Sequence, residues 1–294
     1  MSSQAAENRT DPMSADRPTK PPSAALQSEP QSEPISKPTS KPTSKQADPH
    51  ILLDAVSVGY GETVIQHDLS FGVRRGDVFV IMGGSGSGKS TLMRSLIGLL
   101  APQAGRILFD GESFWDAPEQ ARTRRMRRNG VMYQSGALWS SMTLEENVAL
   151  PLEQYTNLRR RQIHEVAVYK LALVGLAAYC DYYPSEISGG MRKRVGVARA
   201  MALDPDILFF DEPSAGLDPL SARLLDDLIL ELRESLGTTM VVVTHDLASI
   251  FSIADDSVFL DAATQTMLTT GNPRDLREHC EIKLVRDFLS RGGE

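Results

Sequence analysis

A glycine-rich segment that follows a short apolar run limits the possible folds of this chain more than any other feature. The apolar run, residues 78–82, is uninterrupted, which is typical of a strand buried on both faces of a parallel sheet. The next segment, residues 83–91, reads GGSGSGKST and fits the P-loop pattern G-x-x-x-x-G-K-[ST]. Leu92, Leu96 and Leu99-Leu100 then recur at helical spacing, so the segment is expected to join a strand to a helix.

This context gives the glycine-rich segment a chemical role. Glycines allow successive backbone N–H groups to converge on phosphate oxygens, and the N-terminus of the following helix adds a partial positive charge. Lys89 would reach the β- and γ-phosphates, and the Ser90 hydroxyl would be a ligand of Mg²⁺. The alternative is a Gly/Ser-rich turn without a ligand, which explains the strand, the helix and the Lys-Ser-Thr ending less well. We therefore predict a nucleoside triphosphate site made by Gly83, Gly84, Ser85, Gly86, Ser87, Gly88, Lys89, Ser90 and Thr91.

Composition sets broader bounds. At 294 residues the chain could hold one large domain or two small ones, and its net charge of −7 argues against a general nucleic-acid binder. Cys180 and Cys280 lie far apart without CxxC spacing, which fits a reducing cytosol and gives no metal or disulfide signal. No apolar run approaches the ~18 residues that span a bilayer, and the N-terminus lacks a signal-peptide pattern. We expect any work at a membrane to depend on another polypeptide.

The first part of the chain differs from the rest in composition. Residues 1–48 are rich in Ser, Pro, Lys, Glu and Gln, and the tetrapeptides QSEP and SKPT are each repeated there. Such a segment buries too little apolar surface to offset the entropy of ordering it, so we expect a disordered tail. The alternative is a Pro-rich ligand for a partner domain. Residues 49–294 then form the folded domain.

Within this domain, the patterns alternate between strands and helices. Apolar strand patterns occur at residues 51–58, 64–73, 207–210, 240–244, 257–260 and 267–270, and residues 106–111 end in a hairpin-type Asp-Gly. Residues 135–187 are expected to be mainly helical, and a short helix is expected near residues 284–289. Ser188 precedes a helix, and Asp218 and Pro219 begin another.

Polar residues follow three of the buried strands. The P-loop follows the first, Asp211 and Glu212 follow the second, and His245 follows the third. Ligands of parallel sheets bind beyond the carboxyl ends of the strands, so these groups can converge on one phosphate. Asp211 can hold Mg²⁺, Glu212 can deprotonate a water molecule, and His245 can bond the γ-phosphate. Gln134 can link the water or the metal to a neighbouring domain. Each residue alone is more often structural, but the P-loop favours the functional interpretation.

These residues resemble the motifs of the ATP-binding cassette family from residue 51 onward. Residues 187–191, ISGGM, stand where the LSGGQ signature belongs, and Tyr133-Gln134, residues 207–212, residues 214–218 and His245 match the other family motifs. The resemblance implies a P-loop NTPase (RecA-like) α/β core with a parallel sheet, an antiparallel β subdomain and a helical signature subdomain at about residues 135–200. It also implies an ATPase that uses ATP and Mg²⁺.

The resemblance further implies residue roles in a homodimer. Two copies would sandwich two ATP molecules head to tail, with Ser188, Gly189 and Gly190 of one copy closing over ATP held by the other. Tyr60 would stack on adenine. Met191 replaces the Gln of the signature, so discrimination of base or ribose is expected to be loose. The implied catalytic residues are Glu212, His245, Gln134 and Lys89; the implied metal ligands are Ser90, Gln134 and Asp211; and Asp218 and His245 join the nucleotide-binding residues.

Within the family, residues 131–138, 143–148, 189–194 and 285–289 are similar to the ATPases of Mla/MCE-type lipid transporters. That subgroup implies phospholipid transport between the inner and outer membranes, at the cytoplasmic face of the bacterial inner membrane. The implied partners are a membrane permease, an MCE-domain protein and a STAS-domain protein. Alternatives are an ATPase of a small-solute importer or lipoprotein extractor, and a soluble cassette protein acting on DNA or ribosomes. The last usually carries a long coiled coil or two cassettes, and this chain has neither.

Residues 134–161 are expected to form the docking surface for the permease. The segment begins beside the predicted γ-phosphate position and carries Trp139, Met142 and Leu144, which we expect to be exposed. Two arginine clusters, residues 122–128 and 159–161, are candidates for contact with anionic lipid. The alternative is that Trp139 lies in the core and the arginines solvate a helix.

Overall fold

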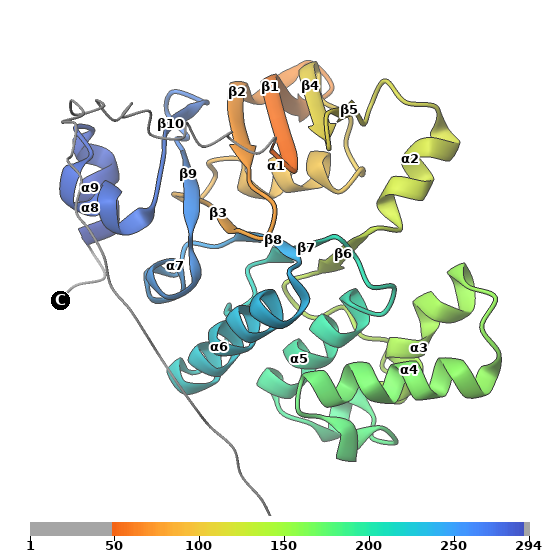
Figure 1. Ribbon diagram of the computed structural model, residues 1–294. Helices are drawn as coiled ribbons and strands as arrows, with labels where there is room; N and C mark the ends of the chain where they lie inside the picture. The colour runs from red at the N-terminus through yellow and green to blue at the C-terminus, as the bar shows by residue number, and fades with distance from the viewer. Residues whose placement is uncertain (1–48, 291–294) are drawn as a thin grey trace, which may run out of the picture. The chain divides into compact units, whose positions relative to one another are not determined.

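The computed structural model describes residues 49–290 of the chain. The predicted disordered tail, residues 1–48, lies outside the described residues, as do residues 291–294. Within the described part, the strands form a six-stranded sheet and a four-stranded antiparallel sheet (Figure 1).

The six-stranded sheet has the order β10-β9-β3-β8-β7-β6. Neighbouring strands from β9 to β6 are parallel, and only β10 is antiparallel to its neighbour, β9. The carboxyl ends of β3, β7 and β8, which the predicted site residues follow, therefore lie at one edge. The strands are β3 (Val78–Gly83), β6 (Asn129–Met132), β7 (Ile207–Asp211), β8 (Thr239–Val243), β9 (Asp256–Leu260) and β10 (Met267–Thr270).

The antiparallel sheet has the order β2-β1-β4-β5. Its β4–β5 hairpin turns at Asp110 and Gly111, whose φ angles of 51° and 79° are the left-handed pair expected for a two-residue Asp-Gly turn. The strands are β1 (Ile51–Tyr60), β2 (Thr63–Val73), β4 (Ala104–Phe109) and β5 (Glu112–Ser113).

The uninterrupted apolar pattern of β3 arises because the strand borders two hydrophobic cores. Phe79 and Ile81 point into the core shared with the antiparallel sheet and with α1 (Lys89–Leu96). Val78, Val80 and Met82 point into the opposite core, where helices from the second half of the chain cover the sheet. Both faces of the strand are therefore buried, as the sequence predicts.

Helices from the middle of the chain pack on one another beyond β6 and β7 (Figure 1). α3 (Leu144–Tyr155) contacts α4 (Arg160–Leu173) and α5 (Gly189–Ala200), and α5 contacts α6 (Pro219–Leu236). The remaining helices are α2 (Glu119–Met126), α7 (Leu247–Ile253), α8 (Pro273–His279) and α9 (Lys283–Ser290). Of the segment predicted to be mainly helical, residues 135–143 form a loop.

Among residues 49–290, no helix is both long enough and apolar enough to cross a bilayer. The helix after the P-loop is shorter than its leucine pattern suggests, because Gly98 has a φ of 85° and ends it. The Leu99 and Gly98 N–H groups bond back to the carbonyls of Arg94 and Ser95, which is a Schellman motif. Leu99 is consequently exposed rather than part of the buried helix face.

Candidate nucleotide site

A cavity of about 690 Å³ lies at the carboxyl edge of the parallel sheet. It is formed where β3, β7 and β8 end and where the chain leaves β6. The cavity therefore brings together residues that the sequence places far apart. Its lining comprises residues 83–91, Gln134, Glu212, His245, Ile65 and Phe288.

The P-loop backbone requires glycine at two positions where a side chain would not fit. A Cβ at Gly83 would lie 2.2 Å from the Leu260 carbonyl oxygen, and the φ of Gly83 is 148°. Gly88 is the N-cap of α1 with a φ of 80°, so its own conformation is also left-handed. These two positions bend the loop around the N-terminus of α1, whose backbone N–H groups and partial charge favour an anion.

Lys89 is the buried cation of this loop. Its Nζ atom donates hydrogen bonds of 2.9 Å to the carbonyl oxygens of Gly83 and Gly84. Burial lowers the pKa of Lys89, while the carboxylates of Glu212 and Asp211 act in the opposite direction. The buried Ser87 hydroxyl in the same loop has no hydrogen-bond partner among the described residues. The loop thus carries a cation and a hydroxyl that an incoming phosphate can satisfy.

Glu212 is held in an unusual backbone conformation directly after β7. Its φ of 48° is left-handed, and its N–H donates to the Val243 carbonyl of β8 at 2.8 Å. The side chain meets the imidazole of His245, with 2.9 Å between Oε1 and Nδ1. Strain of this kind concentrates at functional positions. The predicted contact of His245 with the γ-phosphate stays a prediction.

Asp211 provides a second carboxylate at the same strand end. Burial and the neighbouring Glu212 carboxylate raise the pKa of Asp211, whereas Arg94, Lys193 and Lys89 lower it. Among residues 49–290, no group of three or more His, Cys, Asp and Glu side chains is arranged to hold a metal ion. A cation here would therefore need ligand oxygens from the phosphates in addition to those of the protein.

Other predicted nucleotide-binding residues do not line this cavity. The Tyr60 hydroxyl accepts a hydrogen bond of 2.6 Å from Arg94 of α1. Ser188 is the N-cap of α5 and accepts from the Met191 N–H, so Gly189 and Gly190 form the first turn of that helix. Asp218 caps α6 by accepting from the Ser221 N–H at 3.0 Å, as its sequence position predicts.

Sequence reasoning missed two features of this region. Ile65 and Phe288 line the cavity although neither was predicted to bind nucleotide, and only the fold brings β2 and α9 to the P-loop. A second cavity of about 490 Å³ adjoins the first, and Glu212 and His245 line both. The Glu212–His245 pair therefore lies between the P-loop cavity and the segment of residues 214–217.

The loop after Gln134 holds a large aromatic side chain in the open. Trp139 is 58% exposed, which contradicts a core position, whereas Leu144 is fully buried and was wrongly expected to be exposed. The buried Asn147 fixes this loop: its Oδ1 accepts from the Trp139 N–H, and its Nδ2 donates to the carbonyls of Trp139, Met142 and Thr143. A groove of about 390 Å³ lies nearby between α2, α3 and α5.

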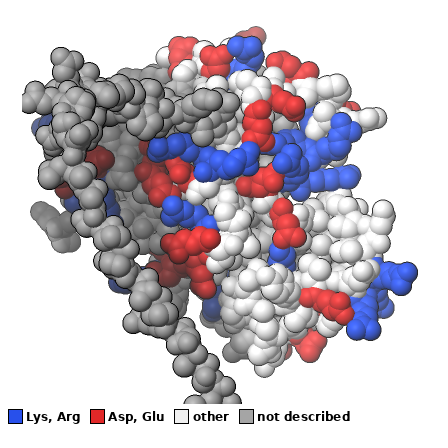
Figure 2. Space-filling model, viewed as in Figure 1, with Lys and Arg blue, Asp and Glu red and all other residues white. Residues whose placement is uncertain are grey.

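The arginine clusters occupy separate parts of the surface (Figure 2). Arg124, Arg127 and Arg128 are exposed at the end of α2, and residues 159–161 are exposed where α4 begins. Arg125 instead binds Asp110, with 2.9 Å between Nη1 and Oδ2. The first cluster is therefore only partly a solvated helix face.

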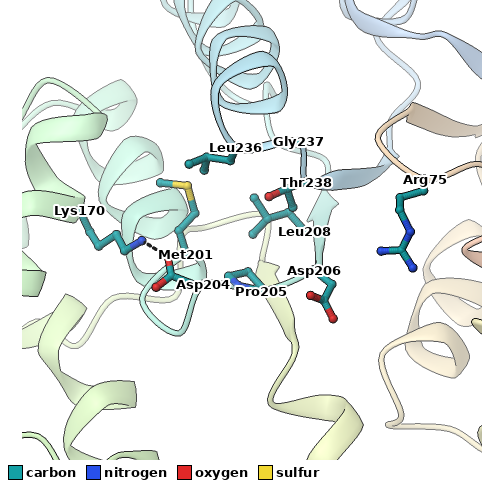
Figure 3. Close-up of a pocket in the computed structure, with 10 residues that line it drawn as sticks. All are labelled: Arg75, Lys170, Met201, Asp204, Pro205, Asp206, Leu208, Leu236, Gly237 and Thr238. Carbon is teal, nitrogen blue, oxygen red and sulfur yellow. Dashed lines mark hydrogen bonds and ion pairs between the residues drawn. The ribbon is translucent and has the colours of Figure 1, made fainter.

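The opposite edge of the sheet carries a smaller pocket of about 240 Å³ (Figure 3). Asp206 and Thr238, which line it, directly precede β7 and β8, so the pocket lies at the amino edge of the strands. Figure 3 shows Lys170 bonded to Asp204 across one end of the pocket.

A parallel sheet with a P-loop, two carboxylates and a histidine at its carboxyl edge defines a P-loop nucleotide hydrolase. The family model described as ABC transporter matches residues 66–215, and the chain belongs to the ABC transporter family. It is an ATP-binding cassette ATPase, and the fold class predicted from the sequence is confirmed.

Two curated relatives carry the same name, intermembrane phospholipid transport system ATP-binding protein MlaF. The Haemophilus influenzae protein is 38% identical over 77% of this chain and 85% of its own length. The Escherichia coli (strain K12) protein is 41% identical over 80% and 86%. A Mycobacterium tuberculosis protein named as a probable ribonucleotide transport ATP-binding protein, mkl, is 36% identical over 82% and 66%.

Solved cassettes have the same fold. A dimer of the ATP-binding cassette MJ0796 bound to ADP and Pi, in a post-hydrolysis state, is 27% identical with a TM-score of 0.67, over 76% of this chain and 98% of that one. cbiO1 from Clostridium perfringens, part of the ABC transporter complex cbiONQ, is 28% identical with a TM-score of 0.73, over 84% and 98%.

Proposed function

We propose that this chain is the ATPase subunit that drives phospholipid transport between the inner and outer membranes of a diderm bacterium. The observation that carries the proposal is the convergence of the P-loop, Glu212 and His245 on one cavity, in a chain similar to two proteins named for that transport. Our proposal places it at the cytoplasmic face of the inner membrane, attached through a permease. MCE-domain and STAS-domain proteins complete the proposed transporter.

The residues of the cavity supply the parts that phosphoryl transfer to water requires. Lys89 and the P-loop N–H groups bind the phosphates. Mg²⁺, when bound, neutralises phosphate charge, and Ser90, Gln134 and Asp211 offer the hard oxygen ligands it prefers. Glu212 accepts the proton of the attacking water, and its bond to His245 orients the carboxylate.

Hydrolysis in our proposal takes place in a head-to-tail homodimer. The signature residues at the start of α5 do not line the P-loop cavity of their own chain, and in our proposal a second copy supplies its signature residues to that cavity. An exposed helix N-terminus of this kind suits a phosphate presented from outside. The solved structures of the similar cassette MJ0796 are dimers, which supports a dimer here.

Attachment to the permease is proposed to use the loop that carries Trp139. An exposed tryptophan on a loop fixed by four hydrogen bonds loses little entropy when a partner covers it. The loop begins at Gln134, which lines the nucleotide cavity, so nucleotide and permease can bias the same segment.

The test is Trp139→Glu in a bacterium whose transport depends on this chain. A charge at the centre of an apolar contact should prevent assembly with the permease while ATP binding and thermal stability stay normal. Phospholipid transport between the membranes, measured by pulse labelling, should be lost together with the assembly. Ribonucleotide uptake, measured in the same cells, tests the activity for which the mycobacterial relative is named.

Leu236→Glu is the matched control, because Leu236 is also an exposed large apolar residue but lies at the amino edge of the sheet. It should leave assembly and transport unchanged. Normal assembly and transport by Trp139→Glu would refute the docking surface, and a defect confined to ribonucleotide uptake would refute the lipid substrate.

A further inference from the structure

Lys193 is a buried lysine whose charge has no direct ionic partner. It lies on α5 and is only 6% exposed. Among the described residues its Nζ atom has one hydrogen-bond acceptor, the backbone carbonyl oxygen of Glu212 at 3.3 Å, and no carboxylate within 4.0 Å. A nearly buried ammonium group with one acceptor is costly, so it is expected only where it serves a purpose.

The acceptor belongs to the residue that we assign as general base. The Glu212 carbonyl oxygen receives two hydrogen bonds, one from Lys193 and one from the Ala215 N–H at 3.2 Å. The Glu212 N–H is bonded to Val243, and the side chain is bonded to His245. Among the described residues, Lys193 thus makes the one hydrogen bond that joins Glu212, with its left-handed backbone, to α5.

The same helix begins at the signature residues. Ser188 is the N-cap of α5, and Lys193 lies about one and a half turns further along, roughly 7 Å along the helix axis. The start of α5 also approaches the start of α6, because a Cβ at Gly190 would lie 3.4 Å from the Cβ of Ser221. A displacement of the α5 N-terminus would therefore move Lys193 and, through its hydrogen bond, the carbonyl of Glu212.

We infer that Lys193 is a positioning residue through which α5 holds Glu212, and that it links the two nucleotide sites of the dimer. The inference rests on the head-to-tail dimer of the proposed function. There, the Ser188 end of α5 touches the nucleotide held by the partner copy, whereas Glu212 acts on the nucleotide held by its own P-loop. Nucleotide in one site then sets the geometry of the general base in the other.

The experiment compares full-length chains with Lys193, Lys193→Gln and Lys193→Met for ATP hydrolysis and for binding of a fluorescent ATP analogue. Met keeps the length of the side chain but has no donor, and Gln keeps a donor on a shorter side chain. We expect kcat to fall in the order parent, Gln, Met, with about a tenfold loss for Met, because misplaced general bases lose rate. The Hill coefficient for ATP should fall toward 1, while KM and analogue affinity stay within about twofold.

Lys170→Met is the matched control, since Lys170 is the other buried lysine of the helical region and is bonded to Asp204 (Figure 3). It should keep the kcat and the Hill coefficient of the parent. A kcat and Hill coefficient for Lys193→Met within twofold of the parent would overturn the inference. If that variant does not fold by circular dichroism, the same criterion is applied to Lys193→Gln. A parent chain that hydrolyses ATP without cooperativity would also overturn the link between the two sites, whereas a Glu212→Gln chain that stays monomeric in ATP would contradict the dimer of the proposed function.

Discussion

The two edges of the parallel sheet both hold charged groups, but these groups have different partners at each edge. At the amino edge, Arg75 and Arg125 bind Asp110, Arg128 binds Asp206, and Lys170 binds Asp204. At the carboxyl edge, the hydrogen bonds that the ammonium groups of Lys89 and Lys193 make within residues 49–290 go to backbone carbonyls. Burial lowers the pKa of both lysines, and the nearby carboxylates of Glu212 and Asp211 act in the opposite direction.

The difference distinguishes a structural edge from a reactive one. Ion pairs that close within the chain leave no charge for a ligand, and the amino edge has a pocket of only about 240 Å³. At the carboxyl edge, cations and carboxylates surround a cavity of about 690 Å³ without pairing, so each can bind a different group of a ligand. His50 likewise offers no charge to a ligand, because burial and the nearby Arg75 lower its pKa to about 4 and keep the ring neutral.

The largest expected effect comes from removing the base at the carboxyl edge. Glu212→Gln should lower kcat about 100-fold or more, since it removes proton acceptance but keeps the shape of the side chain. ATP should still bind, and with hydrolysis blocked the variant should accumulate as a dimer in ATP, measured by light scattering.

Lys89→Ala should instead weaken ATP binding about tenfold or more through the lost charge-assisted bonds to phosphate.

Either of two results would contradict the role that we assign to Glu212 at the reactive edge. Hydrolysis by Glu212→Gln within a few-fold of the parent would remove its role as base. A variant that stays monomeric at high protein and ATP concentrations would contradict the ATP sandwich.

A smaller effect is expected at Asp226, which lies beneath the carboxyl edge where α6 packs on α7. Asp226 is only 4% exposed, and desolvation raises its pKa from 3.8 to about 6. The folded state thus holds this proton more tightly than the unfolded state. The stability from this group is present below pH 3.8 and is lost as the pH rises through 6, a loss of about 3 kcal/mol at most.

Asp226→Asn should therefore raise the free energy of unfolding at pH 7.5 by about 1 to 3 kcal/mol, and by about half as much at pH 5. Urea unfolding at the two pH values measures the difference. Asp227→Asn is the control on the same helix, because Asp227 is exposed and should change stability by less than about 0.5 kcal/mol. A gain that is equal at both pH values would show that the ionisation of Asp226 is not its source.

The sequence was sufficient to predict the reactive edge because its parts are contiguous motifs at strand ends. Residues 83–91, 211–212 and 245 each follow an apolar run, and parallel strands align their carboxyl ends whatever the intervening chain does. The start of α5 at Ser188 and that of α6 at Asp218 were likewise readable from cap residues.

Contacts between distant residues could not be predicted in this way. The Lys193–Glu212 bond, the Arg94–Tyr60 bond and the place of Phe288 in the cavity depend on how helices pack on the sheet. β6, α7 and α8 were not predicted. The two helices have seven residues each, which is too few to show a helical period. Leu144 was wrongly predicted to be exposed because it was grouped with Trp139. It is instead the first residue of α3 and lies on the buried face of that helix.

The smallest effect is expected at the amino edge, where Lys170→Met should change the free energy of unfolding by at most about 1 kcal/mol. The Asp204 carboxylate that pairs with Lys170 is 81% exposed, so water solvates it when its partner is lost. Met also keeps the apolar contacts of the lysine stem. In a domain of this size such a change lowers the Tm by about 2 to 4 °C at most, as differential scanning calorimetry can measure, while kcat stays that of the parent. A Lys170→Met chain that folds normally but hydrolyses ATP tenfold more slowly would show that the amino edge also serves the reaction, and the contrast between the two edges would then fail.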